Sequence, residues 1–312
     1  MNISVTSGDL IKDFGIEEAY RMIGEAGFTA VDWSLDRLLS IRSEAANAPE
    51  LKNLCILERP LPQILEHFAP ELREMQKNGL HVGQIHAPFP YYVQGREDIV
   101  DYSIGLYLRT IELADAIGCP YVVIHGHTPS AGTTESCDDP AYIDTLNERM
   151  FTSLIDTVKN TNVIVCMENL YRSGSAASYY EGHASDPHLA AAQIDALNAM
   201  AGKECFGLCM DTGHLNMLGK RFYTYVPVLG HRIKCLHIHD NPGIADSHLA
   251  PYSGTVLWKE FTEELKKIGY RGNLNFETIP QITRKRTPAP LVPVFLKLIY
   301  DIGAYFRSEI QS

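Results

Sequence analysis

Metal-capable side chains stand at the ends of six consecutive stretches of the sequence that have the composition of β-strands. These side chains are His86, His125, Glu168, Asp211, His237 and Glu277. In a (β/α)8 barrel, such strand ends converge on one mouth. Carboxylates gathered in a half-buried cup repel one another and take up protons unless a cation neutralises them. The pattern therefore predicts a divalent metal ion held by three carboxylates and one imidazole, namely Glu168, Asp211, His237 and Glu277.

The chemistry of these ligands narrows the choice of metal. Carboxylate oxygens with a single imidazole nitrogen suit Mn, Mg or Co, and Zn less exclusively. Asp246 and His248, which follow the seventh strand, can add a second metal or hold substrate, although a solvated loop is an equal alternative. Taken singly, Glu168 can pair with Arg172, and Asp211 can cap the helix after it. The prediction depends on these residues occurring together at successive strand ends.

The elements that must position these side chains alternate in type along the chain. The expected strands are short β-branched or apolar runs: Ile3–Thr6, Ala30–Trp33, His81–Ile85, Tyr121–Ile124, Val163–Met167, Gly207–Met210, Ile233–His237 and Asn273–Phe276. The expected helices are longer amphipathic segments: Ile16–Ala26, Leu61–Asn78, Val100–Ile117, Ala141–Asn160, Pro187–Met200, Phe222–Leu229, Val256–Ile268 and Val292–Tyr305. Eight such alternations predict one (β/α)8 TIM barrel domain over residues 1–312. A doubly wound sheet would usually show a glycine-rich phosphate-binding loop after its first strand. The segment Ser7-Gly8-Asp9 has too few glycines to form one.

Composition excludes several classes of protein. Hydrophobic residues make up 45% and charged residues 21%, as in a globular protein with a sizeable core. The formal charge of −11 argues against a nucleic-acid partner, which usually requires a basic face. Seven cysteines without CxxC spacing indicate reduced thiols rather than a disulfide framework. We find no signal peptide and no stretch approaching the ~20 apolar residues of a membrane span, so a cytoplasmic protein without a membrane partner is expected.

Three long loops follow predicted strands, so in a barrel they lie on the catalytic face as lids or specificity elements. They are Ser43–Pro60, Tyr171–Asp186 and Asn241–Gly254. The run Thr283–Arg286 follows the last strand, where barrels often bind phosphate, but a charge run is more often solvated surface. Phe89, Tyr91 and the Tyr179–Tyr180 pair can supply apolar walls or simply pack in their loops. His127 and His239 are expected to support the site from behind or to lie at the surface.

The motifs resemble the sugar phosphate isomerase/epimerase family of the xylose isomerase-like barrel superfamily. The resemblance spans about residues 80–278, and its pieces are specific only through their joint order and spacing. They are His86-Ala87-Pro88-Phe89, Val123-Ile124-His125, Glu168-Asn169, Asp211-Thr212-Gly213-His214, His237-Ile238-His239-Asp240-Asn241, Asp246-Ser247-His248-Leu249, Gly254-Thr255-Val256-Leu257-Trp258, Ile268-Gly269-Tyr270-Arg271-Gly272 and Phe276-Glu277. By this resemblance the predicted tetrad matches the metal ligands of ketose 3-epimerases, and His214 matches their substrate-contacting histidine.

The same superfamily includes endonuclease IV, whose nine ligands hold three zinc ions. All nine have counterparts here: His86, His125, Glu168, Asp211, His214, His237, Asp246, His248 and Glu277. The sequence also departs from ketose 3-epimerases, with Gly243 in place of an arginine, Gly174 in place of a glutamate, and Tyr252-Ser253-Gly254 in place of Gly-Glu-Gly. Substrate contacts of that subgroup therefore do not transfer to this chain.

The expected reaction is isomerisation or epimerisation of a sugar or sugar phosphate through a metal-stabilised enediolate. Glu168 and Glu277 are the expected catalytic residues, one removing a proton next to the carbonyl and the other returning it. His214 is expected to orient a substrate oxygen, and His86, His125, Asp246 and His248 to bind substrate or a second metal. The alternatives are a zinc phosphodiesterase acting on abasic DNA and a metal-dependent dehydratase or lyase. Barrels of this kind often associate through their helices, so a homo-oligomer is compatible with the sequence.

Overall fold

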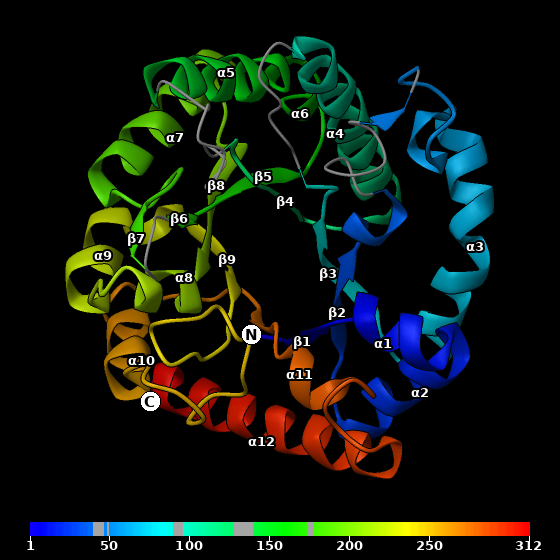
Figure 1. The fold of residues 1–312 in the computed structure, drawn as a ribbon, viewed down its shortest axis with the longest axis vertical. Coiled ribbons are helices and arrows are strands. Elements are labelled where there is room, and N and C mark those ends of the chain that lie inside the picture. Colours follow the sequence, from blue (N-terminus) through cyan, green and yellow to red (C-terminus); the bar gives the residue numbers. More distant parts are fainter. Residues whose placement is uncertain (40–46, 49, 90–95, 128–139, 174–177) are drawn as a thin grey trace. The chain divides into compact units, whose positions relative to one another are not determined.

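Eight parallel strands form one sheet in the order β10-β1-β2-β3-β4-β5-β8-β9 (Figure 1). The computed structural model that shows them describes residues 1–39, 47–48, 50–89, 96–127, 140–173 and 178–312. The strands are β1 (Ile3–Thr6), β2 (Ala30–Ser34), β3 (His81–His86), β4 (Tyr121–Ile124), β5 (Ile164–Glu168), β8 (Phe206–Asp211), β9 (Ile233–His237) and β10 (Leu274–Phe276). A parallel bridge from Ile238 to Phe276 joins the two ends of this order. The predicted (β/α)8 barrel is confirmed, with strand bounds within one or two residues of those expected.

Helices flank the sheet. They are α1 (Gly8–Phe14), α2 (Ile16–Ala26), α3 (Leu61–Lys77), α4 (Glu97–Ile117), α5 (Pro140–Ser153), α6 (Ile155–Val158), α7 (Pro187–Ala201), α8 (Thr212–Met217), α9 (Phe222–Leu229), α10 (Trp258–Lys267), α11 (Ile279–Ile282) and α12 (Val292–Gln311). Four 3₁₀ turns accompany them: Asp36–Leu38, Ile56–Glu58, Gly230–Arg232 and Ala289–Leu291. All eight predicted helices are present among them.

The chain divides into two compact units. Unit 1 comprises residues 1–33, 69–84 and 209–312, and unit 2 comprises residues 34–68 and 85–208. The two units are described separately below. The prediction of one barrel domain over residues 1–312 stays a prediction.

Unit 1 is built on the ladder of β10, β1 and β2. Val5 of β1 pairs with Phe276 on one side and Val31 on the other. The strands are buried on both faces, as expected for parallel strands covered by helices. Helix α12 packs against α2 and α10, and Phe306 on its inner face stacks on Trp258 with ring centroids 5.3 Å apart.

The segment Ala289–Gln311 corrects the expectation that no stretch approaches the length and hydropathy of a membrane span. Among the described residues it is the one helical segment that could cross a membrane by length and composition, with a mean hydropathy of 1.4. Its buried residues include Leu296, Ile299 and Phe306, which recur at helical spacing. A helix of the outer layer of a barrel carries the same apolar stripe, so this finding is weak support for a membrane.

Unit 2 contains the pairing of β4 with β5 and the helices α4, α5, α6 and α7. Val123 pairs with Cys166 and Ile124 with Met167, so the ends of these two strands lie level. Helix α7 begins at Pro187 after an N-cap, because the Asp186 carboxylate accepts hydrogen bonds from the backbone N–H groups of His188 and Leu189. It ends before Gly202, whose φ of 67° is the left-handed conformation that favours glycine.

The structure differs from the predictions in several short elements. The segment expected as one loop, Tyr171–Asp186, contains a hairpin of β6 (Tyr171–Ser173) and β7 (Tyr179–Glu181). The helix expected over Ala141–Asn160 is divided into α5 and α6, because the chain tightens at Leu154, whose N–H bonds to the Phe151 carbonyl three residues back. Helices α1, α8 and α11 have seven residues or fewer, too few to show a helical period. Residues 43–46 and 49 of the first predicted loop, and Tyr91, lie outside the described residues.

Candidate metal centre

The first group of potential ligands in unit 1 joins residues of three strands or of the positions directly after them. His237, the last residue of β9, has Nε2 3.3 Å from Asp32 Oδ2 and Nδ1 3.9 Å from Glu277 Oε2. Asp32 and His237 are fully buried, and the Glu277 side chain keeps 15% of its surface exposed. A carboxylate behind one imidazole nitrogen fixes the ring and leaves the other nitrogen for a metal. Nδ1 of His237 is therefore the nitrogen that remains available to a metal, on the side of Glu277.

Asp32 is held in place by polar side chains of neighbouring strands. Its Oδ2 accepts hydrogen bonds from Asn275 Nδ2 at 2.9 Å and Gln84 Nε2 at 3.1 Å. Asn275 in turn accepts a hydrogen bond from Ser4 Oγ at 2.9 Å. Side chains that are hydrogen-bonded on several sides have little freedom, so the orientation of His237 is set by the strands themselves.

The second group centres on Asp211, the last residue of β8. Its Oδ1 accepts a 2.7 Å hydrogen bond from the backbone N–H of His214, which caps helix α8, and its Oδ2 lies 2.9 Å from His239 Nε2. One carboxylate oxygen of Asp211 therefore caps helix α8, as the second alternative predicts, and the other faces an imidazole. That Asp211 binds a metal stays a prediction. Gly213 allows this approach, because a Cβ there would stand 2.0 Å from the His239 ring.

The segment after β9 folds back and carries Asp246 and His248 to the same group. Backbone hydrogen bonds of 2.7 and 2.8 Å between Asp240 and Leu249 close it. Asp246 Oδ2 lies 3.4 Å from His214 Nε2 and 3.3 Å from His248 Nε2. His248 has a φ of 45°, a conformation that costs energy for a residue with a side chain and occurs preferentially at functional sites.

In unit 1, the His248 imidazole lies between the carboxylates of Asp246 and Glu277. His248 Nδ1 lies 3.3 Å from Glu277 Oε2, so it connects Glu277 to Asp246. Burial would lower the pKa of His248, but hydrogen bonds with Asp246 and Glu277 hold it well above its ordinary value. Burial would likewise raise the pKa of Asp246, but hydrogen bonds from His214 and His248 hold it well below its usual range. Burial raises the pKa of Asp9, which faces the same group from α1.

These residues fit a divalent cation. Three groups in unit 1 have candidate ligand atoms within 4.8 Å of one another: Asp32, His237 and Glu277; Asp211, His214 and His239; and His239, Asp246 and His248. Asp32 Oδ1 and His239 Nδ1 are buried without a hydrogen-bond partner in the described part of the chain. Buried polar atoms of this kind are costly unless a ligand satisfies them. The oxygen and nitrogen atoms suit Mn, Mg, Co or Zn.

In unit 2, three residues at or directly after the ends of strands lie close together: His86, His125 and Glu168. His125 Nε2 lies 2.9 Å from Glu168 Oε2 and 3.1 Å from His86 Nε2, and His86 Nε2 lies 3.7 Å from Glu168 Oε2. The Ala87 carbonyl accepts from His86 Nδ1 at 2.8 Å, which directs Nε2 of that ring toward the group. The Phe89 ring lies against this group, with its centroid 4.6 Å from that of His125.

Asp32 and Asp9, which stand next to candidate ligands, were not predicted from the sequence. His239, expected to support the site from behind or to lie at the surface, is fully buried within the Asp211 group. The His237-x-His239 spacing could have identified His239, because residues two apart on an extended chain point to the same side.

Two basic side chains make other contacts. Arg284, in the run expected to bind phosphate or solvent, lies over the Phe14 ring at 4.4 Å, and its backbone N–H bonds to Asp13. Arg172 lies over the Tyr180 ring at 5.6 Å.

Comparison with known families agrees with this fold. Residues 23–290 match the family model of the xylose isomerase-like TIM barrel. Because this match spans most of the chain, the protein belongs to the xylose isomerase-like TIM barrel family. A curated relative from Sinorhizobium fredii, the uncharacterized protein y4fM, is 27% identical over 276 residues, which is 85% of this chain and 82% of the relative.

Solved structures of sugar epimerases share the fold. A D-tagatose 3-epimerase-like protein is 19% identical with a TM-score of 0.65, and the match covers 98% of this chain and 99% of that one. D-psicose 3-epimerase from Clostridium cellulolyticum H10, solved with D-tagatose, is 12% identical with a TM-score of 0.70 and the same coverage. At such identities the similarity establishes the fold, and the chemistry has to be argued from the site itself.

Proposed function

We propose that the protein is a divalent-metal-dependent isomerase or epimerase of a sugar or a related polyol ketone or aldehyde. The observation that carries the proposal is His237, whose Nε2 lies 3.3 Å from Asp32 Oδ2 and whose Nδ1 lies 3.9 Å from Glu277 Oε2. This arrangement is typical of a histidine prepared to bind a metal. The sugar epimerases among the similar structures support the same class of substrate.

Asp211, His237 and Glu277 are the proposed ligands from unit 1, and Glu168 is the proposed fourth. Glu168 ends β5, and the strands of a (β/α)8 barrel direct their C-terminal ends to one mouth. When bound, the ion polarises a carbonyl oxygen and stabilises the negative charge that forms after proton loss from the adjacent carbon.

The residues of the chain itself would move the proton. Glu168 and Glu277 end the fifth and eighth strands of the barrel, so they can address a sugar from different sides. One carboxylate removes the proton from the carbon next to the carbonyl, and the other returns a proton to the opposite face. Return to the same carbon epimerises the sugar, and return to the neighbouring carbon isomerises it. His214, whose Nε2 faces Asp246, would orient a substrate oxygen.

Solvent exchange tests this proposal. Ketoses, aldoses and their phosphates are incubated in deuterium oxide with enzyme reconstituted with Mn, Mg, Co or Zn, and deuterium incorporation is measured by NMR. Metal-loaded enzyme should exchange the proton next to the carbonyl of at least one sugar, and metal-free enzyme should not. Glu168→Gln and Glu277→Gln should each lower exchange about 10³-fold, because each loses a general base. Full exchange in both variants, with melting temperatures unchanged, would exclude these two residues as the bases.

A second candidate function is a zinc phosphodiesterase of the endonuclease IV kind. The observation that favours it is the retention of further groups beyond the tetrad: His86 with His125 and Glu168, and Asp246 with His214 and His248. The net charge of −11 opposes it, because duplex DNA is usually held by a basic face. Elemental analysis separates the two functions, since three zinc ions with nicking of an abasic duplex would replace the isomerase proposal.

The remaining assignments follow from the proposed function. The proposed partner is a small sugar or sugar phosphate rather than a nucleic acid or a membrane. A cytoplasmic location fits the free thiols of six described cysteines: Cys55, Cys119, Cys166, Cys205, Cys209 and Cys235. Cys137 lies outside the described residues. A homo-oligomer and a dehydratase or lyase activity stay predictions.

A further inference from the structure

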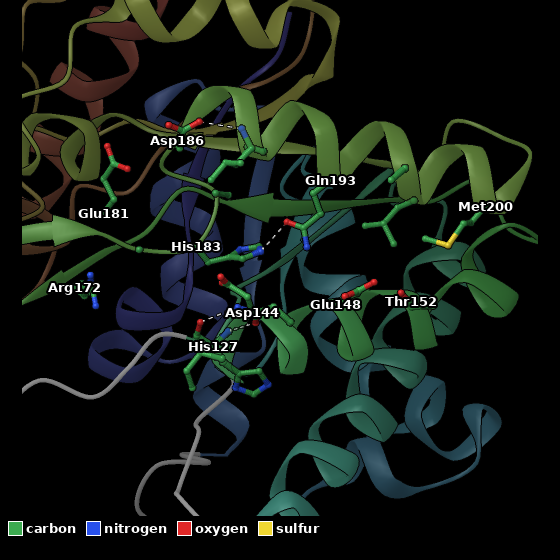
Figure 2. A pocket seen from close by; sticks show the side chains of 18 residues that line it. His127, Asp144, Glu148, Thr152, Arg172, Glu181, His183, Asp186, Gln193 and Met200 are labelled. Carbon is green, nitrogen blue, oxygen red and sulfur yellow. Dashed lines mark hydrogen bonds between the residues drawn. The ribbon is translucent and has the colours of Figure 1, made fainter. Parts of the chain in front are cut away.

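Unit 2 contains a cavity of about 590 Å³ between helices α5 and α7 (Figure 2). The β6–β7 hairpin and the Gly182–Ala184 segment contribute the rest of its wall. Its volume is in the range that holds small organic ligands. None of its lining residues belongs to the proposed metal tetrad, so it is a site of its own.

Two buried histidines line this cavity. His127 is 1% exposed, and neither of its ring nitrogens has a hydrogen-bond partner among the residues the structure describes. Its backbone is fixed by Asn147 of α5, which accepts from the His127 N–H at 2.6 Å and donates to the His127 carbonyl at 3.0 Å. The ring is therefore held in a constant place with unused hydrogen-bonding capacity, which is costly in a protein interior.

His183 is locked beside it. Its ring stacks on Phe151 with centroids 5.3 Å apart, and Nε2 lies 3.0 Å from Gln193 Oε1, as the dashed line in Figure 2 shows. Gly126 lies against the same ring, since a Cβ there would stand 2.3 Å from His183 Cγ. Burial lowers the pKa of both imidazoles to about 4. Both rings are therefore uncharged at neutral pH, and an uncharged ring offers one donor and one acceptor.

The side chains around the cavity disfavour the binding of an anion. Ile143 and Leu197 are buried apolar side chains of α5 and α7, whereas Asp144, Glu148 and Glu181 are exposed carboxylates around the cavity. Arg172 is the one Lys or Arg side chain in the described lining. The free amides at the N-terminus of α7 offer no anion site either, because Asp186 Oδ1 already accepts from two of them at 2.9 Å.

We propose that this cavity binds a small molecule with an apolar body and a hydroxyl or ammonium head group, and that the His127 imidazole recognises the head. The apolar body packs between α5 and α7. The head satisfies a ring nitrogen of His127 for which the described residues provide no partner. A carboxylate or phosphate head of the same size is rejected, because an uncharged imidazole and three nearby carboxylates do not stabilise a negative charge.

Three probes with one apolar body and different heads test the proposal on the full chain. They are 2-phenylethanol, 2-phenylethylamine and phenylacetate, each titrated into the metal-loaded protein at pH 7 and followed by calorimetry and ligand-observed NMR. The alcohol and the amine should bind saturably, and phenylacetate should bind at least tenfold more weakly. Because binding is read directly, the result is independent of whether the isomerase proposal holds.

Two matched variants of α7 locate the site. Ala196 lines the cavity and Ala192 does not, while both are exposed on the same helix. Ala196→Trp should fill the cavity and lower the affinity for the alcohol at least tenfold, whereas Ala192→Trp should leave it unchanged. His127→Phe keeps the shape of the ring and should lower the affinity for the alcohol about tenfold, the loss expected for one buried hydrogen bond.

Three outcomes would overturn the proposal. Equal binding in Ala196→Trp and Ala192→Trp would place the probes elsewhere. Equal binding of phenylacetate and 2-phenylethanol would refute the proposed head group. Absence of saturable binding by both the alcohol and the amine would refute the site, and His127→Gln repeats the test of the head contact if His127→Phe fails to fold.

Discussion

Both units of the protein bury histidine side chains, but in opposite electrostatic surroundings. In unit 1, burial would lower the pKa of His248, yet Asp246 and Glu277 hold it well above the ordinary value of 6.5. In unit 2, burial and, to a smaller extent, the neighbouring His183 lower the pKa of His127 to about 4. Burial lowers the pKa of His183 to about 4 as well. The pKa of this side chain is thus held high beside the carboxylates of unit 1 and held low in the cavity of unit 2.

The difference shows that carboxylates, and not burial, decide what a buried imidazole can bind. Next to carboxylates, the imidazoles of unit 1 form a group whose combined ligands suit a cation. Without buried carboxylates, the imidazoles of the cavity in unit 2 are neutral hydrogen-bonding groups that suit an uncharged or cationic head. The three predictions below test this contrast, from the largest expected effect to the smallest.

Removal of divalent ions should destabilise the protein strongly. An ion present at about 1,000 times its dissociation constant stabilises the folded state by about 4 kcal/mol. Differential scanning calorimetry with Mn and then with a chelator should show this difference as a lower melting temperature. The His127→Phe variant should show the same metal-dependent increment as the wild type. A smaller increment in that variant would mean that the two groups of histidines are not independent.

Lowering the pH should destabilise the protein in part because the buried His127 of the cavity resists protonation in the folded state. Since the folded-state pKa of His127 is about 4 and the unfolded value is about 6.5, the unfolded chain binds more protons between these pH values. Stability is therefore complete above pH 6.5 and falls as the pH drops toward 4, by about 3 kcal/mol for this residue. Urea unfolding at several pH values should show a shallower decline for His127→Phe than for the wild type.

A cavity variant without an ionisable group provides the control for this titration. Thr152→Val changes another residue of the cavity lining and leaves His127 intact, so this variant should keep the acid-dependent slope of the wild type. If His127→Phe and Thr152→Val declined in parallel, the uncharged state assigned to His127 would be wrong.

Asp32→Asn should weaken metal binding more than it weakens the fold. The carboxylate behind His237 Nε2 orients the ring and raises its basicity, and loss of such a partner typically lowers metal affinity 10–100-fold. Glu71→Gln is the matched control. Glu71 is also buried in unit 1, but it accepts hydrogen bonds from Tyr20 at 2.7 Å and Trp33 at 2.8 Å. Titration with Mn should show the loss in Asp32→Asn alone, and equal affinities would remove Asp32 from the site.

The barrel could be predicted because strand-like and helix-like segments alternate along the sequence, and the same alternation marks most of the strand ends. Buried parallel strands appear as short apolar runs, and a polar residue directly after such a run, such as Asp211 or Glu168, stands out. Asp32 does not stand out, because it lies within its strand and its meaning depends on His237 and Asn275, which are more than 200 residues away. Long-range partners of this kind leave no local pattern.

The cavity could not be predicted for a different reason. His127 was read as a supporting or surface residue, since a sequence does not show whether a histidine is buried or has a partner. The β6–β7 hairpin that borders the cavity has strands of three residues, too short for an alternating pattern.

The segment after β9 has an anchored base and an exposed tip. Asp240 accepts hydrogen bonds from Val256 N–H at 3.1 Å and Trp258 Nε1 at 3.0 Å, and Gly254 leaves no room for a side chain next to Asn241. The tip, in contrast, is open to water, with Ile244 67% exposed. Substitutions at the tip should therefore leave Asp246 and His248 in place, so the exposed surface of this segment can change without disturbing the group that these two residues join.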